Sequence, residues 1–100
     1  MKPYRFLPEA NTEFREQIAW YDRESTSLGD KFIADLEATV SGIREYPASG
    51  SRVSKTALKR VLRVFKYNVF YVNAPDEVII VAVAPQRKHP GYWRKRLRAL

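Results

Sequence analysis

Val78-Ile-Ile-Val-Ala-Val-Ala84 decides the fold of this 100-residue chain. Apolar side chains at consecutive positions are typical of a strand that is covered on both faces. Segments 58–65 and 67–72 precede it and are also rich in residues that favour strands. Residues 73–76, Asn-Ala-Pro-Asp, have the composition of a turn. The second half of the chain is therefore predicted to form a three-stranded meander that stops at Pro85.

Two amphipathic helices are predicted upstream of the meander. The first spans about residues 9–24, where four apolar side chains share one helical face: Ala10, Phe14, Ile18 and Tyr21. The second begins at Ser27, which can cap it, and stops at Pro47. Its apolar stripe consists of Leu28, Phe32, Leu36, Val40, Ile43 and Tyr46. A short Ser-Thr-Ser link makes the two helices a hairpin.

The remaining segments complete a single domain over residues 1–100. Residues 4–7 are predicted to form a short first strand, and residues 48–56 a loop rich in serine and glycine. The order β-α-α-β-β-β predicts an α+β fold, in which the helical hairpin packs on one face of a small, mainly antiparallel sheet. The other face would be a groove framed by basic side chains. Residues 94–100 suit either a short helix or a coil.

Charge is distributed unevenly between the two halves of the chain. Residues 1–46 hold nine acidic and six basic residues, whereas residues 47–100 hold twelve Lys and Arg and only two acids. The second half, with a net charge of +10, is built to meet negative charge. No cysteine is present, which excludes disulfides and thiol chemistry. No apolar leader or membrane-length segment is found, so we expect a cytoplasmic protein without a membrane partner.

Few enzymatic chemistries fit these residues. His89 is the only histidine, the four glycines form no phosphate loop, and neither a metal site nor a cofactor is predicted. One chemistry is still compatible with the sequence, the metal-independent cleavage of RNA through attack by its own 2′-hydroxyl. This reaction needs only cations and an acid–base pair. The candidate catalytic residues for it are Arg60, Arg63, Arg87 and Tyr92. Arginine is a poor base, so an enzymatic activity is the weaker interpretation.

Cations alternate with aromatic residues after the last strand, in Pro-Gln-Arg-Lys-His-Pro-Gly-Tyr-Trp-Arg at 85–94. This pattern suits a polyanion or a protein that handles one. The candidate target-binding residues are Arg87, Lys88, Tyr92, Trp93 and Arg94. Arg87 could instead pair with an acid of one of the helices. For Trp93 we favour packing into the core, because tryptophan is usually largely buried.

Six short motifs, in this order, resemble the RelE/ParE superfamily of bacterial type II toxins, and more closely its ParE, or plasmid-stabilisation, branch. They run almost from end to end of the chain: Phe-Leu-Pro-Glu-Ala at 6–10, Ile-x-Trp-Tyr at 18–21, Ser-Leu-Gly-Asp-Lys-Phe at 27–32, Ile-x-x-Tyr-Pro at 43–47, Phe-Lys-Tyr-Asn-Val-Phe-Tyr at 65–71 and Ala-Val-Ala-Pro-Gln-Arg-Lys-His-Pro-Gly-Tyr-Trp at 82–93. One departure is Pro85, where many ParE-like chains carry histidine.

The resemblance implies a growth-inhibiting toxin that a cognate, ParD-like antitoxin neutralises, in a higher-order toxin–antitoxin oligomer. In the ParE branch the implied target is DNA gyrase, which the toxin poisons without being an enzyme. In the RelE branch the toxin is a ribosome-dependent mRNA endonuclease. A non-toxic nucleic-acid-binding module is a third interpretation.

A second group of residues is expected to meet the antitoxin: Trp20, Lys59, Arg60, Arg63 and Arg96. For Trp20 the alternative is packing between the two helices. For the three bases at 59, 60 and 63 it is a charged edge strand that resists aggregation. The register of segment 58–65 does not follow from the sequence, so the faces on which these bases lie stay open.

Overall fold

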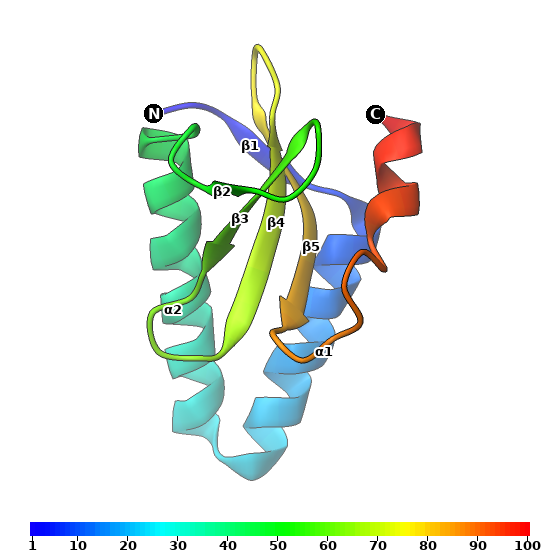
Figure 1. Cartoon of the computed structure of the whole chain (residues 1–100). Helices are drawn as coiled ribbons and strands as arrows, with labels where there is room; N and C mark the ends of the chain where they lie inside the picture. The colour runs from blue at the N-terminus through cyan, green and yellow to red at the C-terminus, as the bar shows by residue number, and fades with distance from the viewer.

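Two helices lie side by side across one face of a five-stranded sheet in the computed structural model, which describes residues 1–100 (Figure 1). The elements are β1 (Tyr4–Phe6), α1 (Pro8–Glu24), α2 (Thr26–Glu45), β2 (Ser51–Arg52), β3 (Ala57–Val61), β4 (Tyr67–Asn73), β5 (Val78–Pro85) and the 3-10 helix η1 (Arg94–Ala99). The predicted α+β class, with a helical hairpin on one face of the sheet, is confirmed. No helix here has both the length and the apolar character that a bilayer span requires.

The sheet has the order β1-β5-β4-β3-β2, and only the β1–β5 pair is parallel. Strand β5 therefore has a neighbour on each side, and its residues 78–84 are buried. This confirms the covered strand that the apolar run predicted. The two-residue strand β2 lies in the segment predicted to be a loop. Its polar residues carry no strand signal, and it forms because Ser51 and Arg52 pair with Lys59 and Leu58 of β3.

The link between the helices is shorter than predicted. Ser25 alone separates them, and its extended backbone (φ −171°, ψ 133°) makes it both the C-cap of α1 and the N-cap of α2. The Ser27 cap is therefore wrong, because Ser27 already lies in the first turn of α2, where its hydroxyl is 3.0 Å from that of Ser25. Tyr46, predicted to end the apolar stripe, is exposed because the helix ends at Glu45 and the chain turns away.

Asp35 is an acidic residue within the buried face of α2, where only 7% of it is exposed. Its two carboxylate oxygens accept hydrogen bonds from the backbone N–H groups of Arg63, Val64 and Phe65, at 3.1, 2.9 and 2.9 Å. These donors belong to the turn between β3 and β4. A buried carboxylate thus supplies the acceptors that this tight turn cannot supply itself.

Replacing Asp35 with asparagine should lower the free energy of unfolding by about 2 kcal/mol. One carboxylate oxygen accepts from Arg63 and the other from Val64 and Phe65, so the amide keeps one acceptor oxygen but points its NH2 group at the donor or donors of the other. Urea denaturation followed by circular dichroism measures the change. Asp30→Asn, on an exposed position of the same helix, is the matched control. Equal losses in the two variants would contradict the role of Asp35 in holding the turn.

Candidate functional site

The register of the sheet separates the basic residues of β3 onto two faces. Lys59 lies opposite Phe70 on the face away from the helices, and Arg60 lies opposite Val69 on the helix face. The Arg60 guanidinium donates to the Ser49 hydroxyl at 2.5 Å and lies against Gly42 of α2. Lys59 can therefore contact a partner on the open face, whereas the Arg60 guanidinium is held by Ser49 and α2 on the helix face. Strand β3 is not a free edge where β2 covers it.

Trp93 lies in the core, as favoured from the sequence. It is 1% exposed and stacks on Phe70, with ring centroids 4.8 Å apart and planes at 27°. Its Nε1 has no hydrogen-bond partner. The indole thus covers Phe70 on the open face, where it also lines a hollow of this face. Its assignment as a target contact does not fit this burial, since no ring face is free for a partner.

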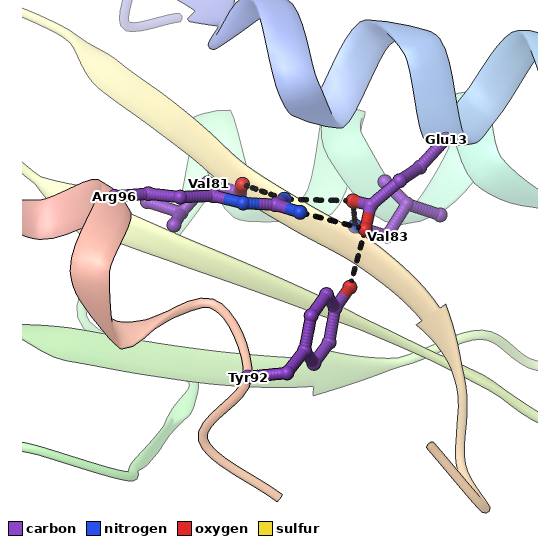
Figure 2. Close-up of polar contacts among 5 residues, drawn as sticks. All are labelled: Glu13, Val81, Val83, Tyr92 and Arg96. Atoms are coloured by element: carbon purple, nitrogen blue, oxygen red, sulfur yellow. Dashed lines mark hydrogen bonds and ion pairs between the residues drawn. The ribbon is translucent and has the colours of Figure 1, made fainter. Parts of the chain in front are cut away.

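Glu13 of α1 holds the C-terminal segment against β5 (Figure 2). Its carboxylate accepts a hydrogen bond from the Tyr92 hydroxyl at 2.6 Å and two from the Arg96 guanidinium at 2.9 and 3.0 Å. It also accepts the backbone N–H of Val83 at 3.0 Å. Arg96 donates in addition to the carbonyl of Val81 at 2.9 Å. Arg96, expected to face an antitoxin, is therefore engaged within the chain.

A bulge in β5 explains why these backbone groups are available. The register with β4 passes from Ala82 to Ile80, so Val81 is an extra residue. An extra residue reverses which backbone groups point to each side of a strand. The carbonyl of Val81 and the N–H of Val83 consequently face the edge beyond the end of β1. The side chains of Arg96 and Glu13 pair with them there, in place of a neighbouring strand.

Two tyrosines of this region stay protonated at neutral pH. Burial, followed by the hydrogen bond with Glu13, raises the pKa of Tyr92 above its ordinary value. Burial and the hydrogen bond with Tyr21 raise the pKa of Tyr67 in the same direction. The hydrogen bond with Glu13 is the largest cause that raises the pKa of Arg96. Tyr92 is therefore a hydrogen-bond donor held by a carboxylate, and it is poorly suited to act as a base.

A pocket of about 360 Å³ opens where α1 passes the ends of β4 and β5. We call it the aromatic-basic pocket, and its lining residues are Gln17, Trp20, Tyr21, Lys66, Tyr67, Pro85 and Arg87. Trp20 is 48% exposed and meets the Tyr21 ring edge-on, at 5.0 Å between centroids. It lines this pocket and does not fill the space between the helices. The fold thus brings Trp20 and Arg87 together, although the sequence placed them in separate groups.

A hydrogen-bonded chain fixes the floor of the aromatic-basic pocket. The Tyr67 hydroxyl donates to Oε1 of Gln17 and accepts from the Tyr21 hydroxyl at 3.2 Å. Tyr67 also packs on Phe32, with centroids 4.9 Å apart, which ties the pocket to the core. The aromatic wall of the pocket is therefore held in place before any partner arrives.

Basic side chains continue from this pocket onto the open face. A second hollow of about 240 Å³ includes Lys59, Lys88, His89 and Arg94 in its lining. A third, lined by Lys66, Pro85, Gln86 and Arg87, shares residues with both. We call these five cations the basic surface: Lys59, Lys66, Arg87, Lys88 and Arg94.

No acidic residue lines any of the three hollows. The two ion pairs of the structure, Arg5–Glu77 and Arg96–Glu13, leave the basic surface untouched. The alternative ion pair between Arg87 and a helix acid is thus not formed. Because their charge is uncompensated within the chain, these cations favour an anionic partner.

The four candidate residues for RNA cleavage are not gathered at one point. Arg60 bonds Ser49 on the helix side, Arg63 lies in the turn that Asp35 holds, and Tyr92 bonds Glu13. Arg87 lines the aromatic-basic pocket. No hydrogen bond or ion pair joins any two of these four residues. No group of three or more His, Asp or Glu side chains is placed to hold a metal ion.

Three residues of the site region escaped the sequence analysis. Glu13 and Gln17 alternate with Ala10, Phe14 and Ile18 at helical spacing, so they border the apolar stripe of α1. A polar residue at the border of a buried stripe is a usable signal for an internal hydrogen bond. Lys66 lies in a turn and carried no such signal.

A family model described as the ParE toxin of the type II toxin-antitoxin system, parDE, matches residues 4–90. No curated protein matches the chain. Among solved structures, one described as the chromosomal ParDE TA system from P. aeruginosa is similar, with a TM-score of 0.64 at 14% identity. The alignment covers 85% of this chain and 96% of that one. At this identity the structural likeness supports the fold alone.

Proposed function

The chain belongs to the ParE toxin family of type II toxin-antitoxin systems, and from this premise we propose that it inhibits growth by poisoning DNA gyrase in the cytoplasm. The family match over residues 4–90 is the observation that carries the proposal. The scattered positions of the four candidate residues for RNA cleavage support a protein poison over a nuclease. Arg87, Lys88 and Arg94 are the cations proposed to contact the target.

A cognate antitoxin is proposed to silence the toxin by covering the basic surface. An acidic antitoxin segment would complement the uncompensated charge there and guide association. Trp20 and Arg63 are the exposed members of the group expected to bind the antitoxin, and the half-buried Lys59 lines the second hollow. Arg96 leaves that group because its guanidinium is bonded to Glu13. A higher-order toxin–antitoxin complex is part of the same proposal.

Arg87→Ala should raise the toxin concentration needed to trap gyrase by about tenfold or more, because arginine is a frequent anchor of protein interfaces. The assay incubates the purified chain with gyrase and supercoiled plasmid and measures linear DNA held in covalent complex with gyrase. Lys31→Ala, which removes one exposed cation from α2, is the control and should behave as the parent chain.

Undisturbed supercoiling by the parent chain would contradict gyrase as the target. Cleavage of mRNA in a translation reaction would then favour the ribosome-dependent alternative. Normal growth of cells that express soluble toxin without an antitoxin would contradict both toxin proposals. The interpretation that would then remain is a non-toxic nucleic-acid-binding module.

A further inference from the structure

We propose that the aromatic-basic pocket binds one nucleotide of a single-stranded nucleic acid, whose backbone then follows the basic surface to Lys59. A base would stack on Trp20, and Arg87 and Lys66 would hold the adjoining phosphate. This binding requires only the chain itself, so it is independent of gyrase.

The aromatic side of the pocket supplies the stacking platform. Trp20 is half exposed although its neighbour Tyr21 is packed against Phe32 and Phe65, at 5.2 and 5.0 Å between centroids. A large indole held edge-on by an anchored ring offers a free π face, and every base has a matching face. The pocket volume of about 360 Å³ lies within the range of small-ligand sites.

The basic side of the pocket supplies the phosphate contact. The side chains of Arg87 and Lys66 line it together, and neither side chain takes part in an ion pair or a hydrogen bond within the chain. Arginine binds phosphate through two parallel donors, and lysine adds a point charge. The Tyr67 hydroxyl below them keeps its proton and adds no negative charge to the pocket.

Continuity of the basic surface favours an extended strand over a free nucleotide. The third hollow shares Lys66, Pro85 and Arg87 with the aromatic-basic pocket, and Pro85 and Gln86 with the second hollow. A backbone leaving the pocket therefore meets Lys88 and Arg94 next. Arg94 also lies over the Trp93 ring, at 5.2 Å from its centroid, which holds its charge at the open face. A single strand fits better than a duplex, because a base inside a duplex is already stacked on both faces and cannot stack on the Trp20 indole.

Tryptophan fluorescence gives a direct readout of this binding. Trp93 is 1% exposed, so a quencher in solution reaches only Trp20. The chain is titrated with oligothymidylate of about 12 nucleotides, a length within the usual site size. Binding should quench the Trp20 emission and leave the Trp93 emission unchanged. A glutamate peptide of equal charge is titrated in parallel. Stronger quenching by the peptide would overturn the proposal in favour of an acidic protein segment.

Variants test the two sides of the pocket separately, by fluorescence polarisation of a labelled oligonucleotide. Trp20→Ala should weaken binding about tenfold, the loss of one stacked base. Arg87→Ala should weaken it too, and should lower the slope of log affinity against log salt by about 0.7. Lys31→Ala should change neither quantity. The buried Trp93 emission reports whether each variant is folded.

Equal affinities for the parent chain and Trp20→Ala would overturn the stacking arrangement, and an unchanged salt slope in Arg87→Ala would overturn the phosphate contact. Because no gyrase is present, a negative result here leaves the gyrase proposal standing. A failed gyrase assay in turn leaves this inference standing.

Discussion

Replacing Trp93 with alanine should lower the free energy of unfolding by about 4 kcal/mol, the largest effect expected of any single substitution in this chain. The indole is buried and stacked on Phe70, so its removal leaves a cavity between the sheet and the C-terminal segment. Neighbouring Tyr92 is tied to Glu13, which limits how far the segment can collapse into the space. Urea denaturation measures the loss.

Trp93→Phe separates the packing of the ring from its unpaired N–H group. Phenylalanine keeps the stacked ring and removes a buried donor that has no partner. We therefore expect a cost well below that of alanine, by about 2 kcal/mol or more. Similar losses in the two variants would contradict the packing argument. A stable Trp93→Ala variant that no longer traps gyrase would instead restore Trp93 as a target contact.

Replacing Glu13 with alanine should lower the free energy of unfolding by about 3 kcal/mol. The change leaves the Arg96 guanidinium, the Tyr92 hydroxyl and the N–H of Val83 without their shared acceptor. The carboxylate and guanidinium are 19% and 16% exposed, so solvent compensates part of the loss. Urea denaturation gives the size of the effect.

Hydrogen exchange shows which part of the chain is destabilised by Glu13→Ala. Amides of residues 89–100 should exchange faster in Glu13→Ala, because the segment loses its anchor to α1 and β5. Glu16→Ala, on an exposed position of the same helix, is the control. A double-mutant cycle with Tyr92→Phe should show coupling, since the two side chains share one hydrogen bond. Additive losses, or equal exchange in the two glutamate variants, would contradict this role of Glu13.

The C-terminal segment links these two predictions to function. Trp93 packs this segment onto the sheet. Glu13 binds Tyr92 and Arg96, which precede and follow Trp93 in the chain. Lys88 lies over the Tyr92 ring, with its Nζ 5.1 Å from the centroid. The position of Lys88, one of the cations proposed to meet the target, therefore depends on how Glu13 and Trp93 hold the C-terminal segment.

Local patterns in the sequence determined most elements of this fold. The exceptions are β2, in a segment predicted to be a loop, and the end of β3 at Val61, since segment 58–65 was predicted to be a strand throughout. Seven consecutive apolar residues predicted the central strand, and helical spacing predicted both helices to within a few residues. These signals are local, because the period of apolar side chains follows from the geometry of a helix or strand. The burial of Trp93 followed from the size of its side chain. The charge of the second half was equally plain from composition.

Tertiary structure alone decided how the site is assembled. The bulge at Val81 exposes the backbone groups that Glu13 and Arg96 bind, and no composition signals a bulge. The register of β3 sent Lys59 to the open face and Arg60 to the helices, because a shift of one residue exchanges the faces of a strand. Trp20 and Arg87 line one pocket only because α1 crosses the end of β5. Such contacts join residues far apart in the chain, so their physical cause is the packing of the elements, which local spacing does not encode.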